Sequence, residues 1–275
     1  MIADITLGQY FPGTSALHKM DPRTKILLSL LYMVSVFCAK NALVFAFLCA
    51  CTVILVLISK IKVRVILRSL RPIVFVMLFT AAISLFLTPG EGDPLFSFWI
   101  FTAYKEGVIR AVFLAIRVIL LVAGVSLFLT YTTSPMALTD GIESLLSPLK
   151  VFKISVHVFA MMMTIALRFI PTLIDETDKI IKAQKSRGAD FSSGGLIKRA
   201  KALIPILIPL LVSSFQHALD LATAMECRCY TGGSGRTKLR ELKMRTFDFI
   251  SLFVGAIVLA FTIWGNYTFT DWISL

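Results

Sequence analysis

The chain has 275 residues, of which 57% are hydrophobic and only 16% are charged, with a mean hydropathy of +0.84. This composition excludes disordered, collagenous and disulfide-rich proteins, and charge-free apolar runs at 42–58 and 72–87 indicate an integral membrane protein. The net charge of +12 could attract nucleic acid, but the cations stand beside the apolar runs. The positive-inside rule explains them better, so no nucleic-acid partner is expected.

The first apolar runs predict two transmembrane helices joined by a tight turn. The run 26–39 has 14 residues, and its helix can extend backwards through Thr24 and Lys25. Lys40 and Asn41 form the turn before the run 42–58. The segment that follows, KIKVRVILRSLRP, holds five cations and no acid, which predicts a cytoplasmic loop.

Two further spans complete the first half of the chain. The run 72–87 places Pro72 in its first helical turn, where the missing N–H costs nothing. The segment 88–107 has one Lys and three acids, which predicts an external loop, and the span 108–131 returns the chain to the cytoplasm. We expect Arg110 to extend to the membrane interface and Arg117 to make a structural contact, with contact to a partner as the alternative for both.

The segment 132–245 has a different character, because it holds 16 of the 28 Lys and Arg and 9 of the 16 acids. It predicts a cytoplasmic module with one short helix over 135–146 and two longer helices over about 155–188 and 196–230. Both long helices begin apolar and end polar. Their apolar stretches are short for spans and suit a membrane interface or a protein groove, and prolines at 171, 205 and 209 should bend them.

A last apolar run at 249–264 follows RTKLRELKMR and should leave the C-terminus outside. The predicted fold is therefore an all-α integral membrane protein with about five transmembrane helices and a cytoplasmic coupling module. Its expected parts are a four-helix membrane region (1–131), the module (132–245), and a last span with an external tail (246–275). Cysteines within apolar runs or one residue apart predict free thiols, and the histidines show no metal-ligand spacing.

The two long helices of the module end in the same pattern. One ends AQKSRGADF and the other AMECRCYTGG, so Arg187 and Arg228, each flanked by small residues, coincide at an offset of 41 residues. Small neighbours leave the guanidinium as the only projecting group, and its five donors suit a narrow groove lined by carboxylates or carbonyls. A cation favoured by the helix dipole before a glycine stop is the alternative interpretation of each end.

These paired motifs, preceded by SALHKMDPRTKILL and followed by YTGGSGRT, resemble the transmembrane T component of energy-coupling factor (ECF) transporters, the EcfT and CbiQ-like family. The resemblance covers nearly the whole chain. It implies that two arginine motifs, usually Ala-Arg-Gly, dock into two ATP-binding-cassette (ABC) ATPases, and that the helices transmit motion to a separate substrate-binding membrane protein, the S component. The motifs fall on Ser186, Arg187 and Gly188 and on Cys227, Arg228 and Cys229, and they depart from the family pattern at Ser186, Cys227 and Cys229.

By this resemblance the chain is expected to be a non-catalytic subunit in a prokaryotic cell membrane. It would bind no cofactor itself, partner ATPases would use the ATP, and the substrate would be a micronutrient such as a vitamin. Met161, Met162 and Met163 either fill a core or offer an adaptable surface to the capture subunit. GGSGRT lacks the spacing of a phosphate-binding loop and predicts a flexible helix exit.

Two rival functions remain. One is the T component of a dedicated nickel or cobalt importer, which the sequence does not separate from a shared vitamin system. The other is a stand-alone membrane carrier or enzyme. That class predicts convergent acids, histidines or broken helices near the spans, and none is evident in the sequence.

Overall fold

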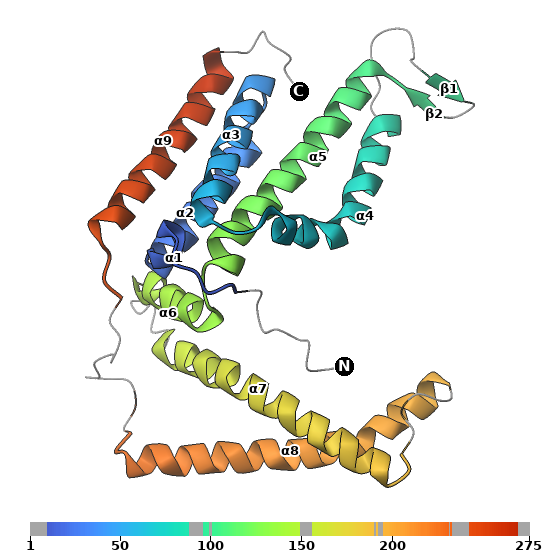
Figure 1. Ribbon diagram of the computed structural model, residues 1–275, viewed down its shortest axis with the longest axis vertical. Helices are drawn as coiled ribbons and strands as arrows, with labels where there is room; N and C mark the ends of the chain where they lie inside the picture. The colour runs from blue at the N-terminus through green and yellow to red at the C-terminus, as the bar shows by residue number, and fades with distance from the viewer. Residues whose placement is uncertain are drawn as a thin grey trace. The chain divides into compact units, whose positions relative to one another are not determined.

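The computed structural model describes residues 10–87, 96–98, 101–148, 156–189, 191, 195–230, 232 and 242–268. The regular secondary structure of these residues is helical apart from one short hairpin, which confirms the predicted fold class (Figure 1). The elements are α1 (Ala16–Lys19), α2 (Pro22–Cys38), α3 (Ala42–Ser59), α4 (Val63–Leu87), β1 (Phe96–Phe98), β2 (Phe101–Ala103), α5 (Lys105–Val125), the π-helix η1 (Ser126–Tyr131), α6 (Pro135–Leu145), α7 (Val156–Ser186), α8 (Leu196–Cys227) and α9 (Thr246–Thr268).

The described residues fall into two compact units. One contains α1 to α5, η1, the first turns of α6, and α9. The other contains the end of α6, α7 and α8. We refer to them as the membrane unit and the two-helix unit.

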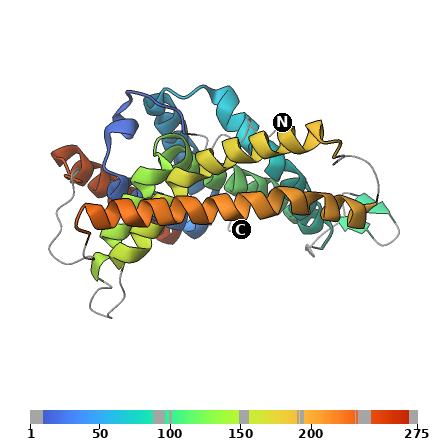
Figure 2. The same cartoon turned by 90° about the horizontal axis from the view of Figure 1, so that it is seen from below.

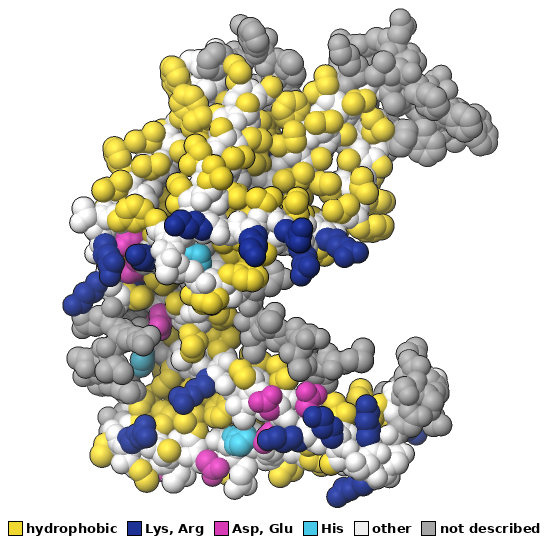
Figure 3. All heavy atoms as spheres, in the orientation of Figure 1, with side chains coloured by type: hydrophobic (Ala, Val, Ile, Leu, Met, Phe, Trp, Pro, Cys, Tyr) yellow, Lys and Arg dark blue, Asp and Glu magenta, His cyan; other side chains and the backbone are white. Residues whose placement is uncertain are grey.

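Each of the five predicted spans coincides with a helix of the membrane unit. α3, α4, the α5–η1 segment and α9 are long and apolar enough to cross a bilayer, and α2, with 17 residues, is near the lower limit of a span. Figure 3 shows the exposed side chains of this unit as a nearly continuous apolar surface, with Lys and Arg along one edge. α7 and α8 also pass the test of length and apolarity, so that test alone does not distinguish them from spans.

The expected start of the third span was wrong. Pro72 does not begin a helix, because α4 starts at Val63 and encloses the proline. The apolar residues of the basic segment recur at helical spacing, so most of the predicted loop is helix. The missing N–H of Pro72 explains the bend of α4 in Figure 1. In the predicted external loop, β1 and β2 pair as an antiparallel hairpin. Residues 88–95 and 99–100 of that loop lie outside the described residues.

The start of α2 is fixed by two buried carboxylates. Asp21 caps the helix by accepting a hydrogen bond from the Arg23 N–H at 2.9 Å, and Pro22 occupies the first helical position. Asp248 of α9 accepts hydrogen bonds from the backbone N–H groups of Asp21 at 3.0 Å and Arg245 at 2.8 Å. These bonds join the beginnings of α2 and α9, which are 227 residues apart in sequence.

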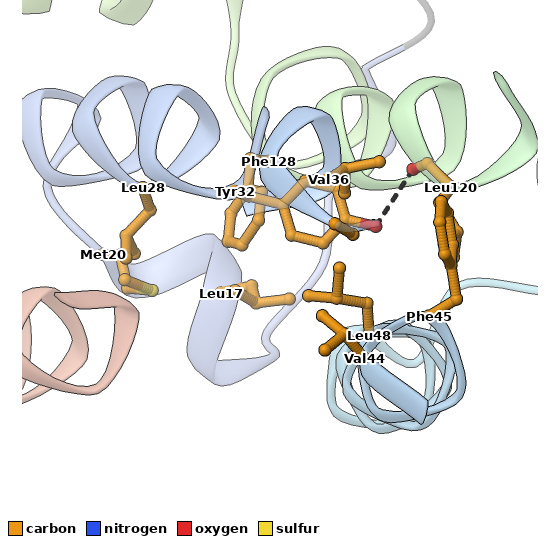
Figure 4. Packing of buried hydrophobic residues seen from close by; sticks show 11 residues of the cluster. Leu17, Met20, Leu28, Tyr32, Val36, Val44, Phe45, Leu48, Leu120 and Phe128 are labelled. Atoms are coloured by element: carbon orange, nitrogen blue, oxygen red, sulfur yellow. Dashed lines mark hydrogen bonds between the residues drawn. The ribbon is translucent and has the colours of Figure 1, made fainter. Parts of the chain in front are cut away.

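The core of the membrane unit surrounds Tyr32 of α2 (Figure 4). Its hydroxyl lies 2.8 Å from Thr52 Oγ1 and donates to the Leu120 carbonyl at 3.1 Å, so one buried group links α2, α3 and α5. A Cβ at Gly124 would lie only 2.1 Å from the Tyr32 ring, so this close approach requires glycine. Apolar neighbours complete the core: Leu17, Leu28, Val36, Val44, Phe45, Leu48 and Phe128.

At the opposite end of α2, Arg117 makes the structural contact expected for it. Its guanidinium donates to the Ala39 carbonyl at 2.8 Å and lies 5.3 Å from the centre of the Phe45 ring. The Lys40 N–H donates to Asn266 Oδ1 of α9 at 3.1 Å, and Asn41 is the N-cap of α3, which confirms the predicted turn. Arg110 is exposed.

Candidate docking site on α7 and α8

The helices predicted in the second half of the chain are present, within one to three residues of the predicted bounds. α7 ends in a defined backbone turn. Gly188 has a positive φ of 84°, its N–H donates to the Lys185 carbonyl at 3.0 Å, and the Ala189 N–H donates to the Gln184 carbonyl at 3.0 Å. These two bonds form a Schellman motif, in which the residue after the C-cap takes the left-handed conformation. The motif places Arg187 at the C-cap, directly after Ser186, the last residue of α7.

α8 ends in the same turn. Cys229 has a φ of 58°, its N–H donates to the Glu226 carbonyl at 2.9 Å, and the Tyr230 N–H donates to the Met225 carbonyl at 3.0 Å. A side chain in this conformation costs about 1 kcal/mol relative to glycine. The sequence repeat is therefore also a repeat of backbone geometry, in which Gly188 and Cys229 are equivalent.

We call residues 186–188 the first arginine tip and residues 227–229 the second arginine tip. All six residues are exposed. Ser186 turns its hydroxyl back to the Lys182 carbonyl at 3.1 Å, so it does not compete for the guanidinium. Among the described residues, neither Arg187 nor Arg228 forms a salt bridge. Each guanidinium is therefore accessible on the described surface.

The structure does not bring the two tips together. α7 and α8 run antiparallel, because Gln184 contacts Pro205 whereas Glu176, earlier in α7, contacts Ser213, later in α8. The first tip therefore lies at one end of the two-helix unit and the second tip at the other (Figures 1 and 2). The N-terminal part of α8, which contains Pro205 and Pro209, is bent relative to the rest, as predicted.

A polar cluster that the sequence analysis missed joins α7 to α8. Glu176 of α7 accepts hydrogen bonds from Ser213 Oγ at 2.8 Å and from His217 Nε2 at 3.0 Å, and the Phe169 ring stacks on His217 with 5.9 Å between centroids. His217 is thus paired with a residue of the other helix. Glu176 and His217 are 41 residues apart, the same offset that separates the two arginines. Aligning the two helices on their arginines would therefore have placed these two residues at equivalent positions.

The cluster affects the charge of Glu176. The hydrogen bond from Ser213 lowers the pKa of this carboxyl, outweighing the opposite effect of desolvation, and the bond from His217 adds to the lowering. Glu176 is therefore ionised at neutral pH, and its two bonds to α8 are charge-assisted.

The three methionines lie in the first turns of α7. Met162 and Met163 are exposed, Met161 is half-buried, and Phe159 beside them is also exposed. α8 presents a longer apolar stripe at helical spacing, composed of Leu203, Ile204, Leu207, Ile208, Leu211, Val212, Phe215 and Leu219. These side chains are about half to two-thirds exposed, so on the described surface they are available to a partner or a membrane interface.

The antiparallel arrangement changes the position of the methionines relative to the tips. Ile165 of α7 and Met225 of α8 line the same apolar groove of about 290 Å³. Met162 is one turn before Ile165, and Arg228 is one turn after Met225. Met162 is thus distant from the first tip along α7, but it lies at the same position along the helix pair as the second tip.

Other candidate groups add no second site among the described residues. All five cysteines are free thiols, and no group of His, Cys, Asp or Glu in the described ranges is arranged to hold a metal ion. His18 of α1 makes only local hydrogen bonds among the described residues, to Ser15 Oγ at 2.6 Å and to the Phe11 carbonyl at 2.9 Å. Of GGSGRT, only Gly232 is described, and the rest lies outside the described residues.

The chain is similar to known proteins over nearly its whole length. The family model CbiQ, described as "Cobalt transport protein", matches residues 13–239, a range that includes both arginine tips. Relatives named "Energy-coupling factor transporter transmembrane protein EcfT" align over nearly their full length. That of Clostridium kluyveri is 50% identical over 271 residues and covers 97% of this chain and 100% of the relative.

The chain belongs to the EcfT family. A second member, from Ruminiclostridium cellulolyticum, is 50% identical over 269 residues, 98% of this chain and 100% of the relative. The Bacillus subtilis member is 44% identical over 260 residues, 94% of this chain and 97% of the relative. The resemblance inferred from the motifs is confirmed, and the chain is a multi-pass membrane component of a transporter.

Proposed function

We propose that this EcfT family member is the non-catalytic scaffold of an ECF-type importer. In this role it couples ATP hydrolysis by two partner ABC ATPases to uptake of a micronutrient, such as a vitamin, through a separate substrate-binding membrane subunit. The observation that carries the proposal is the pair of exposed arginines, neither ion-paired within the described residues, on two helix ends of the same backbone geometry.

The geometry of the tips favours two docking sites over one. A guanidinium at a helix end, flanked by small residues, can enter a narrow groove and bind carboxylates or carbonyls with up to five donors. Because Arg187 and Arg228 lie at opposite ends of the two-helix unit, each would dock into its own ATPase subunit. The Glu176 link between α7 and α8 would transmit a displacement of one tip to the other helix.

The apolar surfaces of α7 and α8 are proposed as the contact for the capture subunit. The methionines at 161–163 are flexible, and the α8 stripe from Leu203 to Leu219 is too apolar to face water alone. The second half of α7 argues against a span, because it carries six charged residues: Asp175, Glu176, Asp178, Lys179, Lys182 and Lys185.

The distribution of cations supports the orientation. Lys19 and Lys60 lie where α1 and α3 end, and Arg23 and Arg245 lie where α2 and α9 begin, so these four cations share one end of the membrane unit. Figure 3 shows Lys and Arg along one edge of this unit. By the positive-inside rule this edge faces the cytoplasm, with the N-terminus and the two-helix unit on the same side and the C-terminus outside.

A dedicated nickel or cobalt importer is the second candidate, favoured by the description of the matching family model. The scaffold would act in the same way there, and the captured substrate would differ. The identity of the capture subunit decides between the two.

Co-purification tests the proposal. The tagged chain, expressed in its own cells and extracted in mild detergent, should retain two ABC ATPases and one small membrane protein. Uptake of labelled vitamins and of labelled cobalt by the reconstituted complex then identifies the substrate class. Transport by the purified chain alone in liposomes, without ATPases, would contradict the scaffold role.

A further inference from the structure

The membrane unit contains an apolar cavity that the proposed function does not use. Its volume is about 430 Å³, and it lies between α1, α2, α3 and α9. The buried side chains of Leu17, Met20 and Leu28 form its floor. Figure 4 shows Leu28 and Met20 extending toward each other on this side of α2.

The cavity exists because α3 and α9 are joined at one end and separate at the other. At the joined end, Lys40 and Asn41 bond to Asn266 and the Gly265 carbonyl, and the rings of Phe47 and Phe261 lie 4.5 Å apart. Toward the other end the two helices diverge, as Figure 1 shows. There Ile54 and Ile58 of α3 and Phe247, Ile250 and Val254 of α9 line the opening, each about half exposed.

Three exposed cations stand at the open end of the cavity. Lys60 follows the lining residue Ile58 by two positions, Arg245 precedes Phe247 by two, and Lys19 adjoins Met20. Two carboxylates lie at the same end, but Asp21 and Asp248 are buried and accept hydrogen bonds from backbone N–H groups. Among the described residues, the accessible charge at this opening is therefore positive.

We infer that this cavity binds one acyl chain of an anionic phospholipid, whose phosphate is held by Lys60, Arg245 and Lys19. The lining is apolar, as a hydrocarbon chain requires, and the cations stand where the headgroup of such a lipid would lie. The volume of about 430 Å³ holds a hydrocarbon chain, whereas a helix ~10 Å wide would place only about one turn inside it.

The occupant would fill a gap that would otherwise leave α3 and α9 without contact at their basic ends. Phe247 and Ile250, in the first turns of α9, line the opening. A lipid in this position would therefore stabilise the start of α9 in the membrane. The inference depends on the membrane unit alone and not on the proposed coupling role.

Lipid retention by the purified full-length protein tests the inference. After extraction in mild detergent, native mass spectrometry counts bound dioleoyl phosphatidylglycerol and dioleoyl phosphatidylcholine, which differ only in the headgroup. The wild-type protein should retain one phosphatidylglycerol and prefer it over phosphatidylcholine. Val254→Phe fills the cavity and should reduce this retention about tenfold, because the added ring occupies the space of the acyl chain.

Matched variants separate specific binding from general detergent effects. Ile257→Phe introduces a ring at an equally exposed position of α9 outside the cavity lining and should retain the lipid. The double variant Lys60→Gln, Arg245→Gln should lower the preference for phosphatidylglycerol about fivefold for each cation removed. The control is the double variant Arg68→Gln, Arg71→Gln, which should leave this preference unchanged. Ile250→Trp provides a second filling variant if Val254→Phe is not monodisperse.

Two results would overturn the inference. One is equal retention of phosphatidylglycerol by wild type, Val254→Phe and Ile250→Trp, which would mean that the lipid binds elsewhere. The other is cross-linking of Ile54→Cys to a partner membrane protein in the intact complex with no retained lipid, which would make the cavity a protein interface.

Discussion

Glu176 of α7 and His217 of α8 are joined by a hydrogen bond of 3.0 Å and are 41 residues apart, the same offset that separates Arg187 from Arg228. Each member of the linked pair therefore lies 11 residues, or about three helical turns, before the arginine of its own helix. The link thus stands at the same distance, ~16 Å, from both tips. A change in the angle between α7 and α8 at this link would move both arginines by similar amounts.

The arginine tips are the first subject for mutation. Arg187→Ala or Arg228→Ala alone should weaken ATPase association and uptake, because each lost charge-assisted hydrogen bond contributes about 1.5–3 kcal/mol and its acceptors stay unpaired. The double variant should abolish coupled transport, and Arg→Lys should restore it only in part, since an ammonium lacks the planar fork. ATPase association is measured by pull-down and transport by substrate uptake, both at equal membrane abundance of the variants. Wild-type uptake by the double alanine variant would show that these arginines only end their helices.

The third residue of each tip should respond in opposite ways to substitution. Gly188→Ala places a Cβ at φ 84°, whereas Cys229→Gly removes one at φ 58°. Hydrogen exchange at the Ala189 amide should become about fivefold faster in the first variant, and exchange at the Tyr230 amide about fivefold slower in the second. Ser186→Ala, within the helix, is the control and should change neither rate. Unchanged exchange in both variants would contradict the equivalence of the two turns.

The Glu176 link should depend on pH in one direction. Because the pKa of Glu176 is lower in the folded protein than its usual 4.5, its stabilisation is complete above that value and is lost as pH falls through the folded pKa. Glu176→Gln should lower the melting temperature by about 1–2 °C at neutral pH and have no effect at strongly acidic pH. Asp175→Asn, at the exposed neighbouring position, should have no such pattern. An effect of Glu176→Gln that is independent of pH would contradict a role for the charge.

The methionine surface can be tested with Met162→Asp. A carboxylate at an apolar contact should reduce association of the capture subunit about tenfold or more. Thr172→Asp, on an exposed face further along α7, should not. Because Met162 is level with the second tip, ATPase binding must be measured in the Arg187→Ala background as well as in wild type. Loss of only the Arg228-dependent binding would assign the methionines to the ATPase contact instead.

Orientation can be measured by labelling introduced cysteines in intact cells. Cysteines at Lys62 and Lys182 should be protected from an impermeant maleimide, and cysteines in the segment 91–105 or at Trp272 should react. Lys238 is predicted to be protected as well. Of these positions, residues 91–95 and 99–100, Lys238 and Trp272 lie outside the described residues. Reaction at Lys182 from outside would contradict the five-span arrangement.

Local patterns were sufficient for much of the fold. Apolar runs and flanking cations located α2, α3, α5 and α9, because a span requires a nearly charge-free stretch whatever its neighbours are. The repeated small-Arg-small pattern identified both helix ends, since glycine and small residues mark a helix end locally. α4 was misjudged at Pro72, because a proline is compatible with both the first turn and the interior of a bent helix.

The sequence by itself determined where the long apolar helices lie, which helices carry the arginines, and the family to which the chain belongs. Only the tertiary structure decided that α7 and α8 are antiparallel, so that the tips lie at opposite ends and Met162 is level with Arg228. It also decided the link from Glu176 to His217, the contact of Gly124 with Tyr32, and the cavity between α3 and α9. These features depend on packing between helices far apart in the chain, which periodicity within one helix does not specify.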